Sequence, residues 1–370
     1  MTYDSTARRD TPLAVKIKNG IQRNGPMTVS RYMSECLWDE AHGYYATRQA
    51  IGQSGDFITS AEISQVFGEL MGLWAAVVWQ NVLGSPPRIQ LVEYGPGRGT
   101  LMFDCLRAAR VVPGFLSAAS VHLVEISGTL AALQRQTLAS SPVPISWSGN
   151  LAGFQTPAII MANEFLDAWP VEQWVKTENG WSQRGVGLDT NGDLCFTLLP
   201  HVAQRFDLDA VLPGASNGDV FESADLGLLA AALKPLALTG PLAMVLIDYG
   251  HTAPASGDTL QAVRGHAYES PLTSPGEADL SAHVNFYDLA VALHGADFEI
   301  DGPVMQTEFL GALGIVERAS RLMSANAARA GEIEAGAARL IAPGGMGSRF
   351  KVIGARSKGL PPLPGLGVKD

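Results

Sequence analysis

The segment IQLVEYGPGRGT, residues 89–100 of a 370-residue chain, carries the clearest indication of the fold. Its apolar start indicates a buried strand that ends at Glu93, and three glycines follow at alternate positions, Gly95, Gly97 and Gly99. Apolar residues then recur at helical spacing, so the glycine turn stands between a strand and the start of a helix. This order is typical of the nucleotide site of a doubly wound α/β sheet, where glycines let a ligand approach backbone N–H groups.

The spacing of the glycines indicates which nucleotide to expect. A dinucleotide-binding loop reads G-x-G-x-x-G, whereas this loop reads E-x-G-x-G-x-G. The latter form is typical of class I methyltransferases, which use S-adenosylmethionine. The next predicted strand, residues 121–124, ends at Glu125, whose carboxylate would accept hydrogen bonds from both ribose hydroxyls. The candidate cofactor-binding residues are therefore Glu93, Gly95, Gly97, Arg98, Gly99 and Glu125.

Two of these assignments have alternatives. Arg98 would bind the methionyl carboxylate of the cofactor or else face solvent. The glycine turn as a whole would bind an adenosine-type cofactor or serve only the packing of the helix on the sheet.

The composition describes a globular protein with a sizeable core, because 46% of the residues are hydrophobic and 17% are charged. The net charge of -10 argues against a nucleic-acid partner and would suit a cationic substrate. Three cysteines and seven histidines lie scattered without the spacing of zinc ligands, so no metal site is predicted. Without an apolar signal core or a run of 18 apolar residues, we expect a cytoplasmic protein with no membrane span.

We expect a helical N-terminal extension over residues 1–85 and an α/β core over residues 86–370, with an insertion at about 171–240. Apolar residues at helical spacing predict a long amphipathic helix over residues 62–83. Its apolar side would pack internally or against a second copy of the chain, so a homodimer is one of two alternatives. The further predicted strands cover residues 143–145, 158–161, 243–247 and 349–353.

Polar side chains directly follow two of these strands. Asn163, Glu164 and Asp167 come after the fourth predicted strand, and Asp248 comes after the fifth. His283 lies in a further polar loop that leads into an apolar helix. Because open α/β sheets place their chemistry at the carboxyl ends of the strands, these five residues are candidates for the acceptor side of the reaction.

Seven motifs, in the same order, resemble the MidA-like methyltransferases, a family with mitochondrial members that act in the assembly of respiratory complex I. The motifs are GDFITSAEISQVFGE (55–69), EYGPGRGTLM (93–102), VHLVEIS (121–127), ANEFLDAWPVEQW (162–174), LIDYG (246–250), PGEADLSAHVNF (275–286) and MGSRFKVI (346–353). The resemblance implies a class I methyltransferase fold, S-adenosylmethionine as the methyl donor and a protein arginine as the acceptor. In mitochondrial relatives it implies a peripheral-arm subunit of complex I as the target.

An arginine acceptor gives the polar residues specific roles. Glu164 and Asp167, with Asp248 as third choice, would hold the guanidinium through bidentate hydrogen bonds. Asn163 would contact the acceptor group, and His283 would take part in proton removal. Each of the carboxylates also has a structural interpretation as a helix cap or a partner in an ion pair, and His283 has one as a hydrogen-bonding loop residue.

The chain departs from the usual family pattern at Leu166, Trp169 and Asn285. Aspartate is common at the last of these positions, so we assign no carboxylate role there. Three other functions compete with the enzyme: an assembly chaperone that keeps the cofactor pocket, an NAD-dependent oxidoreductase, and a hydrolase built on the G-x-S-x-G match at residues 214–218. The glycine spacing disfavours the oxidoreductase, and Pro213 just ahead of the match disfavours a nucleophile elbow.

Overall fold

The computed structural model describes residues 4–47, 59–200 and 207–367. The chain divides into two compact units. The core unit consists of Ile58–Leu166, Leu226–Thr252 and Asp288–Asp370, and the second unit consists of Met1–Phe57, Asp167–Asp225 and Ala253–Tyr287. Each unit has its own hydrophobic core. The first residues of the motif at 55–69 lie outside the described residues.

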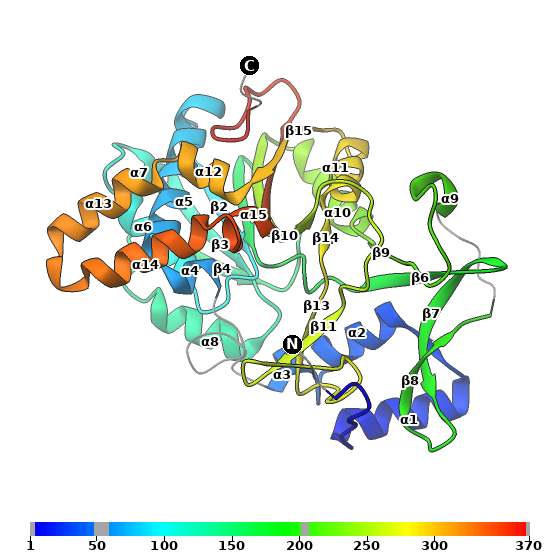
Figure 1. Ribbon diagram of the computed structural model, residues 1–370. Helices are drawn as coiled ribbons and strands as arrows, with labels where there is room; N and C mark the ends of the chain where they lie inside the picture. The colour runs from blue at the N-terminus through cyan, green and yellow to red at the C-terminus, as the bar shows by residue number, and fades with distance from the viewer. Residues whose placement is uncertain (1–3, 48–58, 201–206, 368–370) are drawn as a thin grey trace. The chain divides into compact units, whose positions relative to one another are not determined.

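A seven-strand path forms the centre of the core unit, in the order β15-β16-β10-β5-β2-β3-β4 (Figure 1). The strands of this path are β2 (Ile89–Tyr94), β3 (Ala119–Val124), β4 (Ile145–Ser148), β5 (Ala158–Asn163), β10 (Leu242–His251), β15 (Phe298–Met305) and β16 (Phe350–Ser357). β2 lies between β3 and β5 and is parallel to both. β16 is antiparallel to both of its neighbours, β10 and β15. This arrangement agrees with the sheet expected from the sequence, and the predicted α/β fold class is confirmed.

The strand predictions hold with two differences. The third strand, β4, begins at Ile145, where the predicted strand ends. β15 was not among the predicted strands, and it places the C-terminal strand β16 inside the sheet and not at its edge. Because the chain order changes direction between β2 and β5, the carboxyl ends of these two strands form the switch point at which ligands bind in such sheets.

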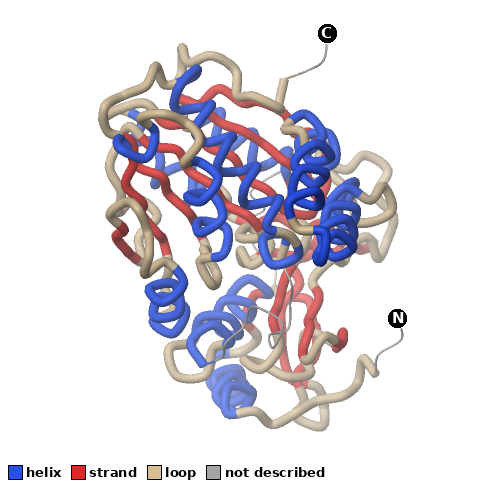
Figure 2. The backbone as a smooth tube through the Cα atoms, turned by 90° about the vertical axis from the view of Figure 1, so that its left-hand side faces the viewer, coloured by secondary structure: helices blue, strands red, loops and turns tan. Residues whose placement is uncertain are grey.

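Helices surround the strands of the core unit, as the tube view shows (Figure 2). The longer ones are α5 (Gln65–Val77), α6 (Thr100–Ala109), α8 (Gly128–Thr137), α10 (Gly227–Ala237), α12 (Gln306–Ala312), α13 (Ile315–Ala325) and α14 (Ala330–Ile341). Shorter helical pieces are α4 (Ser60–Ile63), η1 (Val78–Val82), α7 (Phe115–Ala118), η2 (Ala327–Arg329) and α15 (Met346–Arg349), and α11 (Phe286–Gly295) runs across the division between the units.

The predicted helix at 62–83 is present as α5 and its continuation η1, with a break from α4 at Ser64. The Ser64 hydroxyl accepts a hydrogen bond from the Val66 N–H and so caps α5. α5 packs closely on α6, since a Cβ at Gly72 would lie 2.3 Å from the carbonyl oxygen of Cys105. The apolar side of α5 is therefore buried within the core unit.

This packing changes the domain boundaries expected from sequence. The residues from Ile58 to position 85 belong to the core unit and not to an N-terminal extension. The segment that leaves the core unit after β5 spans Asp167–Asp225, and Leu226–Thr252, with α10, returns to it. A further segment, Ala253–Tyr287, joins the second unit. Contacts between residues far apart in the chain decide these boundaries, and composition does not reveal them.

The second unit contains a five-stranded antiparallel sheet with the path β1-β7-β6-β9, and β8 pairs with β7. Its strands are β1 (Met27–Thr28), β6 (Val171–Thr177), β7 (Gly180–Leu188), β8 (Leu194–Leu198) and β9 (Val220–Ala224), and a smaller sheet holds β11 (Gln261–Arg264), β12 (Ala267–Glu269) and β13 (Asp279–Ser281), with β14 (Val284–Asn285) after it. The helices are α1 (Pro12–Asn24), α2 (Val29–Trp38), α3 (Tyr44–Thr47) and α9 (Leu208–Val211). In the described residues, no helix has both the length and the hydropathy needed to cross a membrane.

Candidate functional site

The glycine loop joins β2 to α6 at the switch point of the sheet. The φ angles of Gly95, Gly97 and Gly99 are 61°, 52° and 83°. Residues with a Cβ rarely adopt these backbone conformations. At Gly95 a Cβ would also lie 2.8 Å from Cδ2 of Phe165. The Gly99 N–H donates a 2.7 Å hydrogen bond to the Pro96 carbonyl, and Gly99 caps the start of α6. The loop thus leads its backbone directly into the N-terminus of α6, a position that favours the negatively charged group of a ligand.

Glu125 lies just past the end of β3, as the sequence predicts. Its Oε1 accepts a 2.7 Å hydrogen bond from the Ser127 N–H, and its Oε2 accepts one of 3.0 Å from Nε2 of Gln134. Burial raises the pKa of Glu125, while these hydrogen bonds act in the opposite direction. The carboxylate is therefore held in a fixed position beside the glycine loop.

Gln134 is a site residue that the sequence analysis missed. It is fully buried in α8, and its Nε2 also donates a 2.8 Å hydrogen bond to the Gly97 carbonyl. Its Oε1 accepts a 3.0 Å hydrogen bond from the indole of Trp147. One side chain thus connects the glycine loop, the ribose candidate Glu125 and β4. The sequence does contain an indication of this role, because Gln134 is an amide four residues after Leu130 and so lies on the apolar side of the predicted helix.

Glu93 is buried at the end of β2, with 3% of its surface exposed. Burial, reinforced by the nearby charge of Glu125, raises its pKa to about 8. Its Oε2 has no hydrogen-bond partner among the described residues. An unpaired buried carboxyl beside a glycine turn fits a ligand that brings a hydrogen-bond donor or a positive charge.

Two further features of the loop fit a nucleoside with an amino-acid tail. Arg98 is partly exposed and makes no hydrogen bond or ion pair with the described residues, which leaves its guanidinium available for a carboxylate. Ile126 follows Glu125 with 63% of its surface exposed, and it provides an apolar surface beside the ribose candidate. With the glycine loop and the unpaired Glu93, these residues fit S-adenosylmethionine.

Asn163 and Glu164 stand at the carboxyl end of β5, next to β2 in the sheet. Glu164 has a φ of 53°, and its Oε1 accepts hydrogen bonds from the Ser60 N–H (2.7 Å), the Ser60 hydroxyl (2.8 Å) and Nδ2 of Asn163 (3.0 Å). Burial raises the pKa of Glu164, whereas these bonds and the charge of Arg339 act to lower it. Oδ1 of Asn163 has no partner among the described residues.

Asp248 is fully buried in β10 and organises the same strand end. Its Oδ2 accepts hydrogen bonds from the N–H groups of Phe165 (3.1 Å) and Leu166 (2.9 Å). Its Oδ1 accepts one of 2.9 Å from the Tyr249 N–H. These contacts give Asp248 a role in shaping the turn that carries Glu164.

The other two acceptor-side candidates, Asp167 and His283, both belong to the second unit. The Asp167 carbonyl accepts a 2.9 Å hydrogen bond from the Ala282 N–H, so the two candidates lie on neighbouring segments. His283 is exposed, and its N–H donates to the Thr259 hydroxyl at 2.9 Å. Asn285, the departure from the family pattern, is buried and accepts a hydrogen bond from the Tyr287 N–H.

The G-x-S-x-G match at residues 214–218 does not form a nucleophile elbow. Its glycines, Gly214 and Gly218, have φ angles of 88° and 95° in turns that follow α9, and in the described residues from 207 onward a helix and not a strand precedes the match. The hydrolase interpretation therefore lacks its structural requirement.

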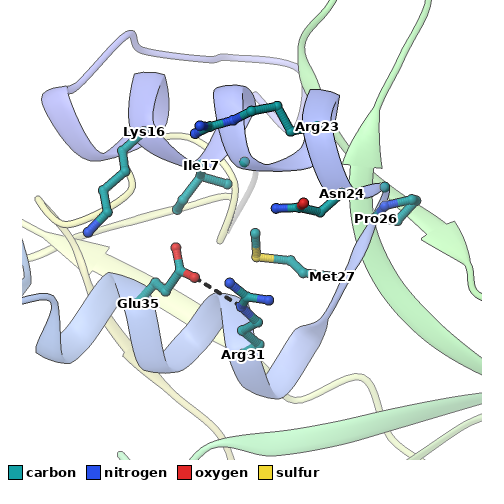
Figure 3. Close-up of a pocket in the computed structure, with 10 residues that line it drawn as sticks. Lys16, Ile17, Arg23, Asn24, Pro26, Met27, Arg31 and Glu35 are labelled. Carbon is teal, nitrogen blue, oxygen red and sulfur yellow. Dashed lines mark hydrogen bonds and ion pairs between the residues drawn. The ribbon is translucent and has the colours of Figure 1, made fainter.

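A cavity of about 220 Å³ lies between α1 and α2 of the second unit (Figure 3). Lys16 and Arg23 border it from α1, and Arg31 and Glu35, which form an ion pair of 3.1 Å, border it from α2. No candidate site residue from the sequence lines this cavity.

Comparison with known proteins agrees with this geometry. Residues 70–304 match the family described as "Putative S-adenosyl-L-methionine-dependent methyltransferase". The mouse protein named "Protein arginine methyltransferase NDUFAF7, mitochondrial" is 36% identical in an alignment of 373 residues. The alignment covers 92% of this chain and 83% of the mouse protein. Its human counterpart of the same name is 37% identical over 340 residues, covering 85% of this chain and 76% of the human protein.

A solved structure has a similar fold over almost the whole chain. It is a Burkholderia thailandensis protein described as a "likely methyl transferase" that is "bound to S-adenosyl-homocysteine". It aligns with a TM-score of 0.84 and 27% identity, over 96% of this chain and 94% of the other. This chain therefore belongs to the S-adenosylmethionine-dependent methyltransferase family, and its methyl donor is S-adenosylmethionine. This family assignment replaces the alternative that the chain is an NAD-dependent oxidoreductase.

Proposed function

We propose that this enzyme methylates the guanidinium group of an arginine in a protein substrate, and that in a host with respiratory complex I the substrate is a peripheral-arm subunit. The arginine acceptor is supported by the relatives named protein arginine methyltransferase, and the complex I target by the family resemblance. The observation that carries the proposal is Glu164, a carboxylate at the end of β5 whose Oε2 makes no hydrogen bond with the described residues.

Glu164 suits a guanidinium because the two groups complement each other in charge and shape. Its Oε1 is occupied by three hydrogen-bond donors, so Oε2 is the atom left to accept from an incoming N–H. A guanidinium has a pKa above about 12 and presents no free lone pair at neutral pH. A carboxylate that holds one of its nitrogens draws positive charge towards that side, so another nitrogen becomes the better nucleophile.

When bound, S-adenosylmethionine supplies a methyl group on a positively charged sulfur. The residues of the chain contribute position, which is worth roughly 7 to 11 kcal/mol in well-oriented reactions. Glu164 aligns the acceptor nitrogen, and the unpaired Oδ1 of Asn163 accepts a hydrogen bond from the same group. Asp248 holds the backbone of the turn that carries Glu164. As the N–C bond forms and the C–S bond breaks, the methylated nitrogen loses one proton.

Two residues of the second unit keep the roles that the sequence predicts for them. Asp167 is the predicted second carboxylate for the guanidinium, and the exposed His283 is the predicted proton acceptor. The glycine loop, Glu93, Arg98 and Glu125 bind the donor. Arg98 pairs with the carboxylate of its methionine part, and Glu125 accepts from the ribose hydroxyls.

The test uses S-adenosylmethionine that carries a deuterated methyl group, incubated with the enzyme and with proteins from a host that lacks the gene. Mass spectrometry of the digest should find labelled arginine with the wild type and at least 100-fold less with Glu164→Gln, because the neutral amide cannot hold the guanidinium in the same way. Glu334→Gln, an exposed glutamate of α14, is the matched control and should retain full activity. Label on lysine or on a small molecule alone would contradict the proposal.

The same variant, tested in cells, distinguishes an assembly chaperone from a methyltransferase. If Glu164→Gln binds the donor normally but fails to restore assembly in a deletion strain, methyl transfer is required. Full restoration by the variant would assign the function to binding alone.

A further inference from the structure

The short helix α4 contacts both ends of the core-unit site. At its first residue, Ser60 donates two hydrogen bonds to Glu164. Near its end, Oε1 of Glu62 accepts a 2.5 Å hydrogen bond from the hydroxyl of Thr100, the first residue of α6 after the glycine loop. The four residues of α4 thus connect the start of α6 to the carboxylate at the end of β5.

Packing keeps α4 in this position. Ser60 is fully buried, and Ala61 belongs to the hydrophobic core of the unit. Helix α14 packs closely against α4, as shown by Gly336, where an added Cβ would lie 2.9 Å from the Ile63 carbonyl oxygen. Ser64 ends α4 and caps α5. The two donors of Ser60 are therefore presented to Glu164 by a short helix that is packed into the core unit.

Glu164 needs such a support because its own backbone is strained. A φ of 53° lies in the left-handed region, which is unfavourable for a residue with a Cβ. The Glu164 N–H donates to the Ile247 carbonyl at 2.9 Å, which fixes the residue from β10. The side chain is fixed separately, by the two Ser60 donors and the amide of Asn163.

We propose that Ser60 is a positioning residue for methyl transfer, which keeps Glu164 ionised and turns its Oε2 towards the acceptor. The proposal rests on the proposed role of Glu164. All three donors bind the same oxygen, so they stabilise the charged carboxylate and leave one oxygen for the substrate. Arg339 in α14 is the charged group that acts on Glu164 in the same direction, while burial opposes it.

The Ser60→Ala variant removes the hydroxyl donor and keeps the backbone N–H, so it tests the hydroxyl alone. Ser60→Cys retains a weak donor of similar size and should recover part of the effect. Ser64→Ala is the matched control, because it removes a buried serine hydroxyl at the adjoining helix cap without a contact to Glu164. Thermal unfolding of all three variants identifies any that fail to fold.

The first readout is the ionisation of Glu164, measured by carbon-13 NMR on protein labelled at the glutamate carboxyl, with Glu164→Gln to assign the signal. Ser60→Ala should raise the pKa of Glu164 by about half a unit to one unit, since a donor to the charged form is lost. Ser60→Cys should give a smaller rise, and Ser64→Ala no change. An unchanged pKa in Ser60→Ala would overturn the proposal, whether or not the protein methylates arginine.

The second readout is the pH profile of methyl transfer. In Ser60→Ala the acidic limb of kcat/KM should move to higher pH by the same amount, with donor affinity by calorimetry unchanged within about twofold. If Ser60 had only a structural role, Ser60→Ala would lower the unfolding temperature and leave the acidic limb of kcat/KM at its original pH. If the wild type transfers no methyl group to arginine, the proposed function fails, and the NMR result still decides the role of Ser60.

Discussion

The side-chain amide of Gln134 donates a 2.8 Å hydrogen bond to the carbonyl oxygen of Gly97, 37 residues earlier in the chain. The same amide reaches the carboxylate of Glu125, so a single buried side chain fixes both halves of the donor site relative to each other. The glycine loop therefore depends on α8 as well as on its own turn chemistry.

Replacing Gln134 by leucine should weaken donor binding and lower stability together. Leucine keeps most of the volume but leaves the Gly97 carbonyl and the Trp147 indole without partners. An unsatisfied buried group costs about 1 to 3 kcal/mol, so the free energy of unfolding should fall by about 2 to 4 kcal/mol. Urea unfolding and calorimetry with S-adenosylmethionine measure the two effects. Gln136→Leu, on the exposed side of α8, should change neither, and equal effects of both variants would refute the assignment.

Replacing Gly95 by alanine should reduce the affinity for S-adenosylmethionine by at least tenfold, or about 1.4 kcal/mol. The new Cβ would meet Cδ2 of Phe165 at 2.8 Å, and a φ of 61° is strained for alanine. Calorimetry gives the affinity. Gly311→Ala in α12 is the control, since a Cβ there meets nothing within 4 Å, and it should stabilise the helix by about 0.5 to 1 kcal/mol. Normal binding by Gly95→Ala would mean that the loop accommodates the methyl group.

The stability of the protein should depend on pH through Glu93. Its pKa is about 8 in the folded state, against 4.5 for an ordinary exposed glutamate, so the folded state holds a proton that the unfolded state releases at lower pH. The stability contributed by the neutral carboxyl is full below about pH 4.5 and is lost as the pH rises through 8.

Glu93→Gln should therefore match the wild type at pH 4.5 and exceed it above pH 8, by up to about 5 kcal/mol. Urea unfolding of both proteins across this range tests the prediction, and Glu334→Gln should follow the wild type throughout. A constant difference between Glu93→Gln and the wild type at all pH values would contradict the assigned pKa.

Replacing Asp248 by asparagine should lower the free energy of unfolding by about 2 to 4 kcal/mol, because the amide nitrogen cannot accept the hydrogen bonds that one carboxylate oxygen now receives. Differential scanning calorimetry would detect the change. Asp189→Asn is the control: one oxygen of Asp189 also accepts two backbone N–H bonds, from Asn191 and Asp193, but Asp189 lies in an exposed turn. Its loss should be below about 1 kcal/mol, and a similar loss in both variants would show that burial is unimportant.

The strand, glycine turn and helix around residues 89–100 could be predicted because their signals are local. Periodicity sets the element type, and a positive φ demands glycine within the turn itself. Glu125 could be predicted for the same reason, as a carboxylate at the end of an apolar run. The family motifs extended this to a class I methyltransferase fold, but β15 was not among the predicted strands.

The partners of the polar residues could not be predicted in this way. Ser60 and Glu164 are 104 residues apart, and Asp248 lies 83 positions from Phe165, whose N–H donates to it. No local pattern distinguishes a serine that orients a carboxylate from one that caps a helix, as Ser64 does. The same holds for the two units, which are each assembled from three separate segments.

The α/β class, the donor loop and the type of cofactor could be predicted because they follow from periodicity, turn chemistry and motifs contained in short segments. Three features emerged from the fold alone: which oxygen of Glu164 is occupied, the burial of Glu93 without a partner for its Oε2 among the described residues, and the contact of Gln134 in α8 with the glycine loop. Desolvation and hydrogen bonding depend on which distant segments are brought together, and a buried polar group is satisfied by whatever neighbour the fold supplies.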